Sequence, residues 1–151
     1  MTREPLPADA PVVLLVDDDR MVLFSTKLVL QSSGFRVVAV DRGALAVEAA
    51  RKEPPDVMLL DIMMPEMDGW ETLSRLRAES GLREIPVLIF TAREHYRGRR
   101  VARELGAVDY VPKPYDAEKL VQLCRTHAEA NRRRVAATAG RSSDVQGVSA
   151  T

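Results

Sequence analysis

The stretch VVLLVDDD, residues 12–19, decides the fold of this chain. Five apolar residues, three of them valine, lead directly into three aspartates. The apolar part has no polar alternation, which is the pattern of a strand buried on both faces of a parallel sheet. The stretch therefore predicts a buried strand that carries carboxylates at its C-terminal end.

Four more short apolar runs follow along the chain, and a helical pattern comes after each of the five runs. The intervening segments are long enough for crossover helices, so the five-fold alternation predicts an α/β fold with a doubly wound, five-stranded parallel sheet and five helices. The other runs fall at residues 37–40, 57–60, 87–90 and 109–111, and the helical patterns at 20–33, 44–52, 70–78, 96–105 and 116 to about 134. Gly34 and Gly106 follow two of these patterns, where a left-handed C-terminal cap is expected.

Length and charge place the chain in a broad class. The length of 151 residues and the apolar fraction of 46% predict one domain. Lys and Arg number 22, as do Asp and Glu, so the net charge of zero gives no general attraction to nucleic acid or membranes. Cys124 is the only cysteine and no apolar run is long enough to span a membrane, which together predict a protein of the cytoplasm with a buried, unreactive thiol.

The two ends differ from the middle. The first eleven residues hold three prolines and show no periodicity, and residues 135–151 are small and polar with no aromatic side chain to bury. Such segments cannot bury enough surface to offset the entropy of ordering. We expect a disordered segment at 1–10, a domain at 11–130, and the end of the last helix with a disordered tail at 131–151.

Polar side chains stand where four of the predicted strands end. In an open parallel sheet these ends share one edge, and ligands bind there, where the strand order reverses. Clustered carboxylates oppose one another's ionisation, and a hard cation with oxygen ligands, such as Mg²⁺, relieves that cost. The strand-end residues are Asp17, Asp18, Asp19, Asp61, Thr91 and Lys113.

These residues resemble the response-regulator receiver domain family (CheY-like) of two-component phosphorelay systems. The matching motifs are Val16-Asp17-Asp18, the run DIMMPEMDG at 61–69, Thr91-Ala92 and Lys113-Pro114, in the family's order and spacing. The resemblance covers about residues 11–128, and the nine-residue run is highly specific by itself. It implies the flavodoxin-like strand order 2-1-3-4-5 and a stand-alone, single-domain regulator.

The resemblance implies a phosphoacceptor. Asp61 would receive a phosphoryl group from a phosphohistidine on a sensor histidine kinase or histidine phosphotransfer protein. Mg²⁺ would be bound by Asp18, Asp61 and the backbone carbonyl of Met63, with Asp17 acting through water. The chain would not be a turnover enzyme on external substrates, since only its own phosphorylation and dephosphorylation are involved.

The resemblance also implies a switch. Thr91 and Lys113 would hold phosphoryl oxygens, a cis Lys113-Pro114 bond would aim the lysine inward, and Tyr110 would swing inward when Thr91 shifts. The first helix carries more apolar residues than one buried face needs, and by resemblance it helps to dock the phosphodonor. Burial of this excess under a neighbouring loop is an equal alternative.

Other functions fit less well. An aspartyl phosphohydrolase of haloacid dehalogenase type needs an acid two residues after its nucleophile, where this chain has Met63. A pseudo-receiver, an interaction module that is never phosphorylated, should lack one of Asp18, Asp61, Thr91 or Lys113. A third alternative is a receiver fragment of a longer regulator. Asp19 has a simpler role, as the N-cap of the first helix.

Output is expected through contact with a downstream protein, with a homodimer as an open alternative. Arginines cluster around residues 93–103 and at 132–134, but no recognition motif accompanies them, so direct DNA binding is disfavoured. The phosphoryl group is expected to be comparatively long-lived, because Met63 offers no acceptor for an attacking water and Arg93 can obstruct its approach.

Overall fold

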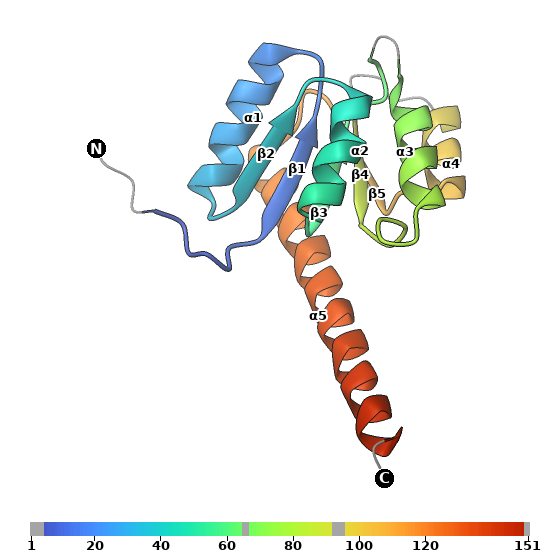
Figure 1. Cartoon of the computed structure of the whole chain (residues 1–151). Helices are drawn as coiled ribbons and strands as arrows, with labels where there is room; N and C mark the ends of the chain where they lie inside the picture. The colour runs from blue at the N-terminus through green and yellow to red at the C-terminus, as the bar shows by residue number, and fades with distance from the viewer. Residues whose placement is uncertain (1–4, 65–66, 92–95, 150–151) are drawn as a thin grey trace.

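The computed structural model describes residues 5–64, 67–91 and 96–149. Five parallel strands form one sheet in the order β2-β1-β3-β4-β5, which confirms the predicted fold and strand order (Figure 1). The strands are β1 (Val12–Val16), β2 (Arg36–Val40), β3 (Val57–Leu60), β4 (Val87–Thr91) and β5 (Asp109–Pro112). The helices are α1 (Arg20–Ser32), α2 (Gly43–Lys52), α3 (Gly69–Ala78), α4 (Tyr96–Glu104) and α5 (Ala117–Ser149).

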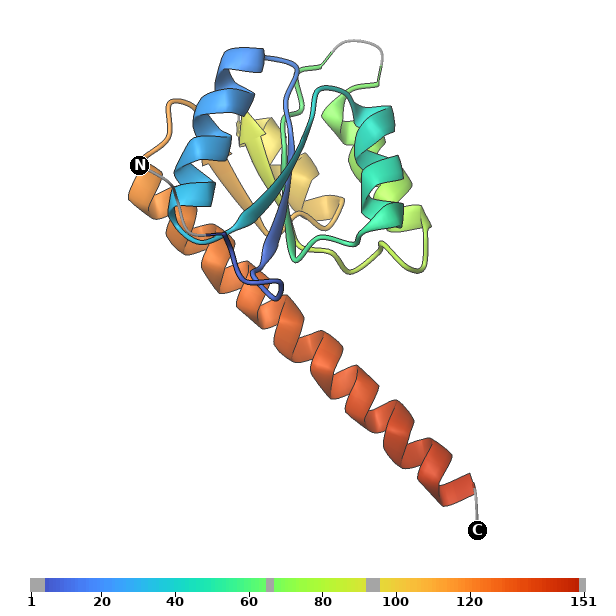
Figure 2. The same ribbon diagram turned by 60° about the vertical axis from the view of Figure 1, so that its left-hand side comes forward.

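The last helix corrects one prediction. We expected a helix end near Arg134 followed by a disordered tail, but α5 continues to Ser149 and projects past the sheet (Figure 2). The docked part of α5 supplies the costly first turn, so each further residue adds a hydrogen bond without a new nucleus. The alanines of residues 136–139 favour that extension. Residues 1–4 lie outside the described part of the chain, and the domain limits at 11 and 130 stay a prediction.

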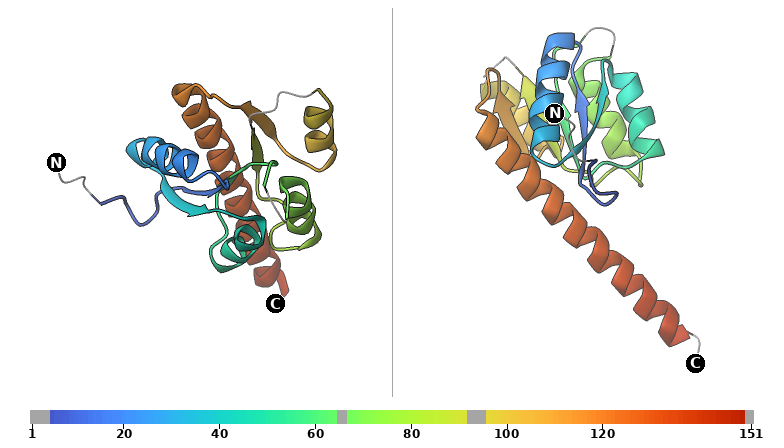
Figure 3. Two further views of the ribbon diagram at one scale, coloured as in Figure 1. Left: turned by 90° about the horizontal axis from the view of Figure 1, so that it is seen from above. Right: turned by 90° about the vertical axis from the view of Figure 1, so that its left-hand side faces the viewer.

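The sheet lies between two helical layers and has a hydrophobic core on each face (Figure 3). All residues of β1, β3 and β4 are buried, as their lack of polar alternation predicted. Neighbours along each strand face opposite sides. Leu14 and Met58, which pair in register, belong to the core under α2, α3 and α4. Leu15 and Leu59 belong to the core under α1 and α5.

The strand order reverses beside β1, which pairs with β2 on one side and β3 on the other. The ladder continues to the residues that carry charge. The amide of Asp17 donates to the carbonyl of Val40 at 3.2 Å, and the amide of Asp61 donates to that of Val16 at 2.9 Å. The backbone therefore fixes both aspartates at the crevice where ligands bind in such sheets.

Helix ends follow the expected chemistry. Asp19 is the N-cap of α1, and its carboxylate accepts hydrogen bonds from the amides of Met21 and Val22, as predicted. Gly34 and Gly106 have φ angles of 97° and 85°, which confirms the left-handed caps. These caps set the short connections into β2 and β5.

Polar contacts tie α5 to the end of the sheet opposite to the aspartates. The Arg132 guanidinium contacts both carboxylate oxygens of Asp56, at 3.0 and 3.2 Å, and Asp56 accepts the amide of Val12 at 2.7 Å. The side-chain amide of Asn131 donates to the carbonyl of Asp56 at 3.2 Å. No helix in the described part of the chain is both long and apolar enough to cross a membrane.

Candidate functional site

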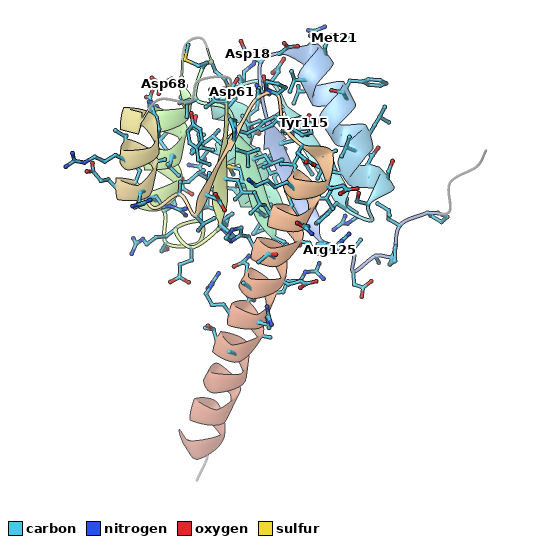
Figure 4. The ribbon with its side chains drawn as sticks, turned by 180° about the vertical axis from the view of Figure 1, so that it is seen from behind. Asp18, Met21, Asp61, Asp68, Tyr115 and Arg125 are labelled. Atoms are coloured by element: carbon cyan, nitrogen blue, oxygen red, sulfur yellow. The ribbon has the colours of Figure 1, made fainter. Side chains whose placement is uncertain are left out.

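Three aspartates meet at the carboxyl ends of β1 and β3, as the sequence predicts. Oxygens of Asp17, Asp18 and Asp61 lie within 4.8 Å of one another. Asp17 is fully buried, Asp61 is 4% exposed and Asp18 is exposed, so the cluster opens to solvent on one side. Figure 4 shows Asp18 and Asp61 at this end of the sheet. Three carboxylates this close need positive charge to stay ionised together.

Lys113 supplies part of that charge. Its ammonium group contacts Asp17 and lies 3.6 Å from an Asp61 carboxylate oxygen. The other Asp17 oxygen accepts the amide of Asp19 at 2.9 Å, so both oxygens of Asp17 already have donors. The amide of Lys113 donates to the carbonyl of Thr91 at 2.9 Å, and the Lys113-Pro114 peptide is cis, as predicted.

The environment of Asp61 favours its protonated form. Burial, and to a lesser degree the nearby Asp17 carboxylate, raise the pKa of Asp61 to about 6. The Met63 amide, which donates to Asp61 at 3.0 Å, and the Lys113 ammonium act in the opposite direction on this pKa. A bound cation would favour the ionised carboxylate further, because opposite charge stabilises the charged form.

Thr91 presents a polar atom that lacks a partner. Its hydroxyl is buried at the end of β4 and has no hydrogen-bond partner among the residues that the structure describes. A buried polar group of this kind costs stability unless a ligand satisfies it. Thr91 Oγ1 therefore fits a site that receives an oxygen-rich group. Tyr110, on the next strand, is half-buried against the core under α2, α3 and α4.

The donor set suits a hard metal ion. The three carboxylates form an oxygen-only group that could hold a cation, and no His or Cys joins them in the described chain. Asp18 is the most exposed of the three and has room for an ion that keeps water ligands. The carbonyl of Met63 as a ligand stays a prediction. Arg93 lies outside the described residues.

A glycine closes the segment that follows Asp61. A Cβ atom on Gly69 would lie 2.4 Å from Ile62 Cα and 2.5 Å from the carbonyl oxygen of Asp61, so no larger residue fits without a backbone shift. The amide of Gly69 donates to the carbonyl of Ile62 at 3.2 Å. Asp68 then caps α3 through the amide of Glu71 at 2.9 Å. At Gly69 the chain therefore returns to close contact with the end of β3.

The sequence did not predict a contact that lies two residues after Lys113. The hydroxyls of Tyr115 and Thr26 are 3.0 Å apart, which joins the segment after Lys113 to α1. The Tyr115 ring packs on Phe90 with ring centres 5.3 Å apart. The signal in the sequence was a threonine on the apolar face of the first helix, where Thr26 is fully buried.

The outer face of α1 carries an exposed apolar stripe. Met21 is 76% exposed, Phe24 is 64% exposed and Leu28 is 40% exposed. The three follow a helical spacing and lie away from the core, so the excess of apolar residues predicted for this helix is exposed, and no loop of the described chain covers it. A stripe of this kind is typical of a contact surface.

Comparison with known proteins agrees with this geometry. The family model of the response regulator receiver domain matches residues 13–125. The chain is a response regulator receiver domain. It is 37% identical over 113 residues to the response regulator MprA of Mycobacterium leprae, which covers 75% of this chain and 49% of that protein. It is 39% identical over 118 residues to the transcriptional regulatory protein CseB of Streptomyces coelicolor, which covers 78% and 49%.

Solved receiver structures share the fold. The Vibrio cholerae chemotaxis protein CheY4 superposes with a TM-score of 0.74 at 27% identity, covering 78% of this chain and 98% of that one. This chain spans about half the length of the curated relatives described above. The family assignment confirms the predicted phosphoacceptor domain of a two-component system, which is not a metabolic enzyme.

Proposed function

We propose that Asp61 is the residue of this receiver domain that becomes phosphorylated. One Asp61 carboxylate oxygen attacks the phosphorus of a phosphohistidine, the new O–P bond replaces the P–N bond, and the imidazole leaves with the bonding electrons and takes up a proton. The observation that supports Asp61 most is its position at the end of β3, beside Asp17, Asp18 and Lys113. Phosphoryl transfer needs positioning and charge neutralisation more than covalent help from the protein.

We propose Mg²⁺ as the cation of the acidic cluster. Asp18 and Asp61 would hold it directly with the Met63 carbonyl, whereas Asp17, with donors on both oxygens, would act through water. When bound, Mg²⁺ supplies positive charge to the oxygens of a phosphoryl group. The Lys113 ammonium would exchange its contact with the aspartates for one with a phosphoryl oxygen. Thr91 Oγ1, which is buried without a partner in the described chain, would donate a hydrogen bond to another phosphoryl oxygen.

We also propose the identity of the partners. A sensor histidine kinase or a histidine phosphotransfer protein would donate the phosphoryl group while docked on the stripe of Met21, Phe24 and Leu28. The reaction would take place in the cytoplasm, which the single buried Cys124 allows because it needs no disulfide. The phosphoryl group on Asp61 would draw Thr91 inward, and Tyr110 would follow it.

Output would pass through a protein contact. Several arginines that suggested a basic surface have acidic partners: Arg100 with Glu104, Arg132 with Asp56, and Arg134 with Glu84. Paired arginines leave less free charge for phosphates of DNA. A homodimer through the same face is the alternative. A pseudo-receiver would lack at least one of Asp18, Asp61, Thr91 and Lys113, and because this chain has all four, that role is disfavoured.

The deciding experiment labels the protein with a radioactive small acyl phosphate in the presence of Mg²⁺. Wild type should acquire one acid-stable, alkali-labile phosphoryl group, and Asp61→Asn should acquire none. Asp41→Asn is a matched control, because Asp41 also follows a strand at this edge and its carboxylate contacts only Arg42 among the described residues. Labelling of Asp61→Asn at the wild-type rate would refute the assignment.

A further inference from the structure

A chain of contacts runs from α1 to Lys113. The Thr26 hydroxyl, fully buried on the inner face of α1, lies 3.0 Å from the Tyr115 hydroxyl. The Tyr115 ring packs on Phe90, with 5.3 Å between the ring centres and 57° between the ring planes. The Lys113 ammonium lies 4.8 Å from the centre of the same Phe90 ring. Figure 4 shows Tyr115 at the beginning of α5, on the side of α1.

Lys113 needs such a support. A lysine side chain has four rotatable bonds and loses much rotamer entropy when it is held in one place. The backbone of Lys113 is held by its bond to the Thr91 carbonyl on one side, but the segment that follows leaves the sheet, and its next residue, Pro114, is exposed. Tyr115 is the residue of this segment that reaches back, since its ring and its hydroxyl both contact buried side chains.

We propose that Tyr115 is a positioning residue: its hydrogen bond to Thr26 keeps Lys113 directed at the acidic cluster. This inference rests on the proposed role of Asp61. Without the bond, the 113–115 segment gains freedom, and the lysine spends less time where a phosphoryl oxygen would arrive. A misplacement of a charged group by a fraction of an ångström slows a reaction that depends on orientation. The bond also connects the site with α1, whose outer face carries the apolar stripe.

Three variants separate positioning from stability. Tyr115→Phe leaves the buried Thr26 hydroxyl without its partner, which should lower the unfolding free energy. Thr26→Val removes the hydroxyl at nearly constant shape, and the half-buried Tyr115 hydroxyl can then bond to water. The double variant removes both polar groups and should recover most of the stability lost in Tyr115→Phe. Ser25→Ala is the control, since it deletes an α1 hydroxyl that bonds only within its own helix.

The measurements are the rate of labelling of Asp61 by acetyl phosphate at saturating Mg²⁺, and the urea midpoint of unfolding. We expect all three variants to be labelled about three- to tenfold more slowly than wild type and Ser25→Ala, with the double variant no faster than the single ones. The Mg²⁺ concentration that gives half of the metal-induced shift in the midpoint should be unchanged, because the carboxylates are intact.

Other outcomes would overturn the proposal in identifiable ways. Labelling rates that recover in the double variant together with its stability would show a purely structural bond. Wild-type rates in Thr26→Val would show that the bond does not position Lys113. If wild type itself acquires no label on Asp61, the proposed function fails first, and this inference falls with it.

Discussion

At the scale of the residue, the surroundings of Asp61 oppose the ionisation of its carboxyl group. Burial raises the pKa of its carboxyl to about 6, whereas an unfolded chain restores the ordinary value near 3.8. Well below pH 4 the carboxyl is protonated in both states, so its ionisation does not affect the unfolding free energy. Between about pH 4 and 6 the unfolded chain ionises while the folded protein keeps its proton, so the unfolding free energy falls, and above about pH 6 the loss is complete.

We therefore predict that Asp61→Asn is more stable than wild type in metal-free solution at pH 8. The gain should reach up to about 3 kcal/mol, because one pKa unit corresponds to about 1.4 kcal/mol, and it should shrink to about 0.5 kcal/mol near pH 4. Urea unfolding with a chelator at pH 4, 6 and 8 measures it. Equal stability of the two proteins at pH 8 would mean that the folded site does not oppose ionisation of Asp61.

At the scale of the element, the return from β3 to α3 depends on Gly69. A Cβ atom there would lie 2.4 Å from Ile62 Cα, and backbone atoms cannot rotate away as a flexible side chain can. The clash falls on the residue after Asp61, so a shift of the backbone would move the carboxylate relative to Asp17 and Lys113. Stability and phosphorylation should suffer together.

We predict that Gly69→Ala lowers the unfolding free energy by roughly 1–3 kcal/mol, the usual cost of overpacking, and slows labelling of Asp61. Gly81→Ala is the matched control, because apart from its chain neighbours nothing in the described chain lies within 4 Å of the added Cβ. Chemical denaturation and acetyl phosphate labelling measure the two effects. If both alanine variants behave alike, the close approach at Gly69 does not constrain the site.

At the scale of the whole molecule, the acidic cluster couples metal binding to folding. Asp17 lies 44 positions before Asp61, and the three carboxylates meet only when β1 and β3 pair, so the unfolded chain has no such site. A ligand that binds only the native state stabilises it by RT ln(1 + [L]/Kd).

We predict that Mg²⁺ at one hundred times its Kd adds about 2.7 kcal/mol to the unfolding free energy. Sodium chloride at equal ionic strength should not reproduce the effect, and Asp18→Asn should weaken the response. Thermal unfolding with Mg²⁺ and with a chelator measures it. Identical curves under both conditions would contradict a metal site at these aspartates.

The sequence pattern by itself was sufficient for the strands and for the polar residues at their ends. Buried parallel strands are marked by unbroken apolar runs, and the residue after such a run must lie at the sheet edge, so Asp17, Asp61 and Thr91 were placed by pattern alone. The family motifs added the strand order. Gly34, Gly106 and Asp19 were predictable because caps depend on local backbone chemistry.

The tertiary structure decided what depends on contacts between distant elements. The length of α5 was underestimated because a helix nucleated on the domain can extend through exposed residues, as it does at 135–140. The raised pKa of Asp61 follows from burial, which no spacing reveals. The bond between Thr26 and Tyr115 joins residues 89 positions apart, and only the packing of α1 against the start of α5 brings their hydroxyls together.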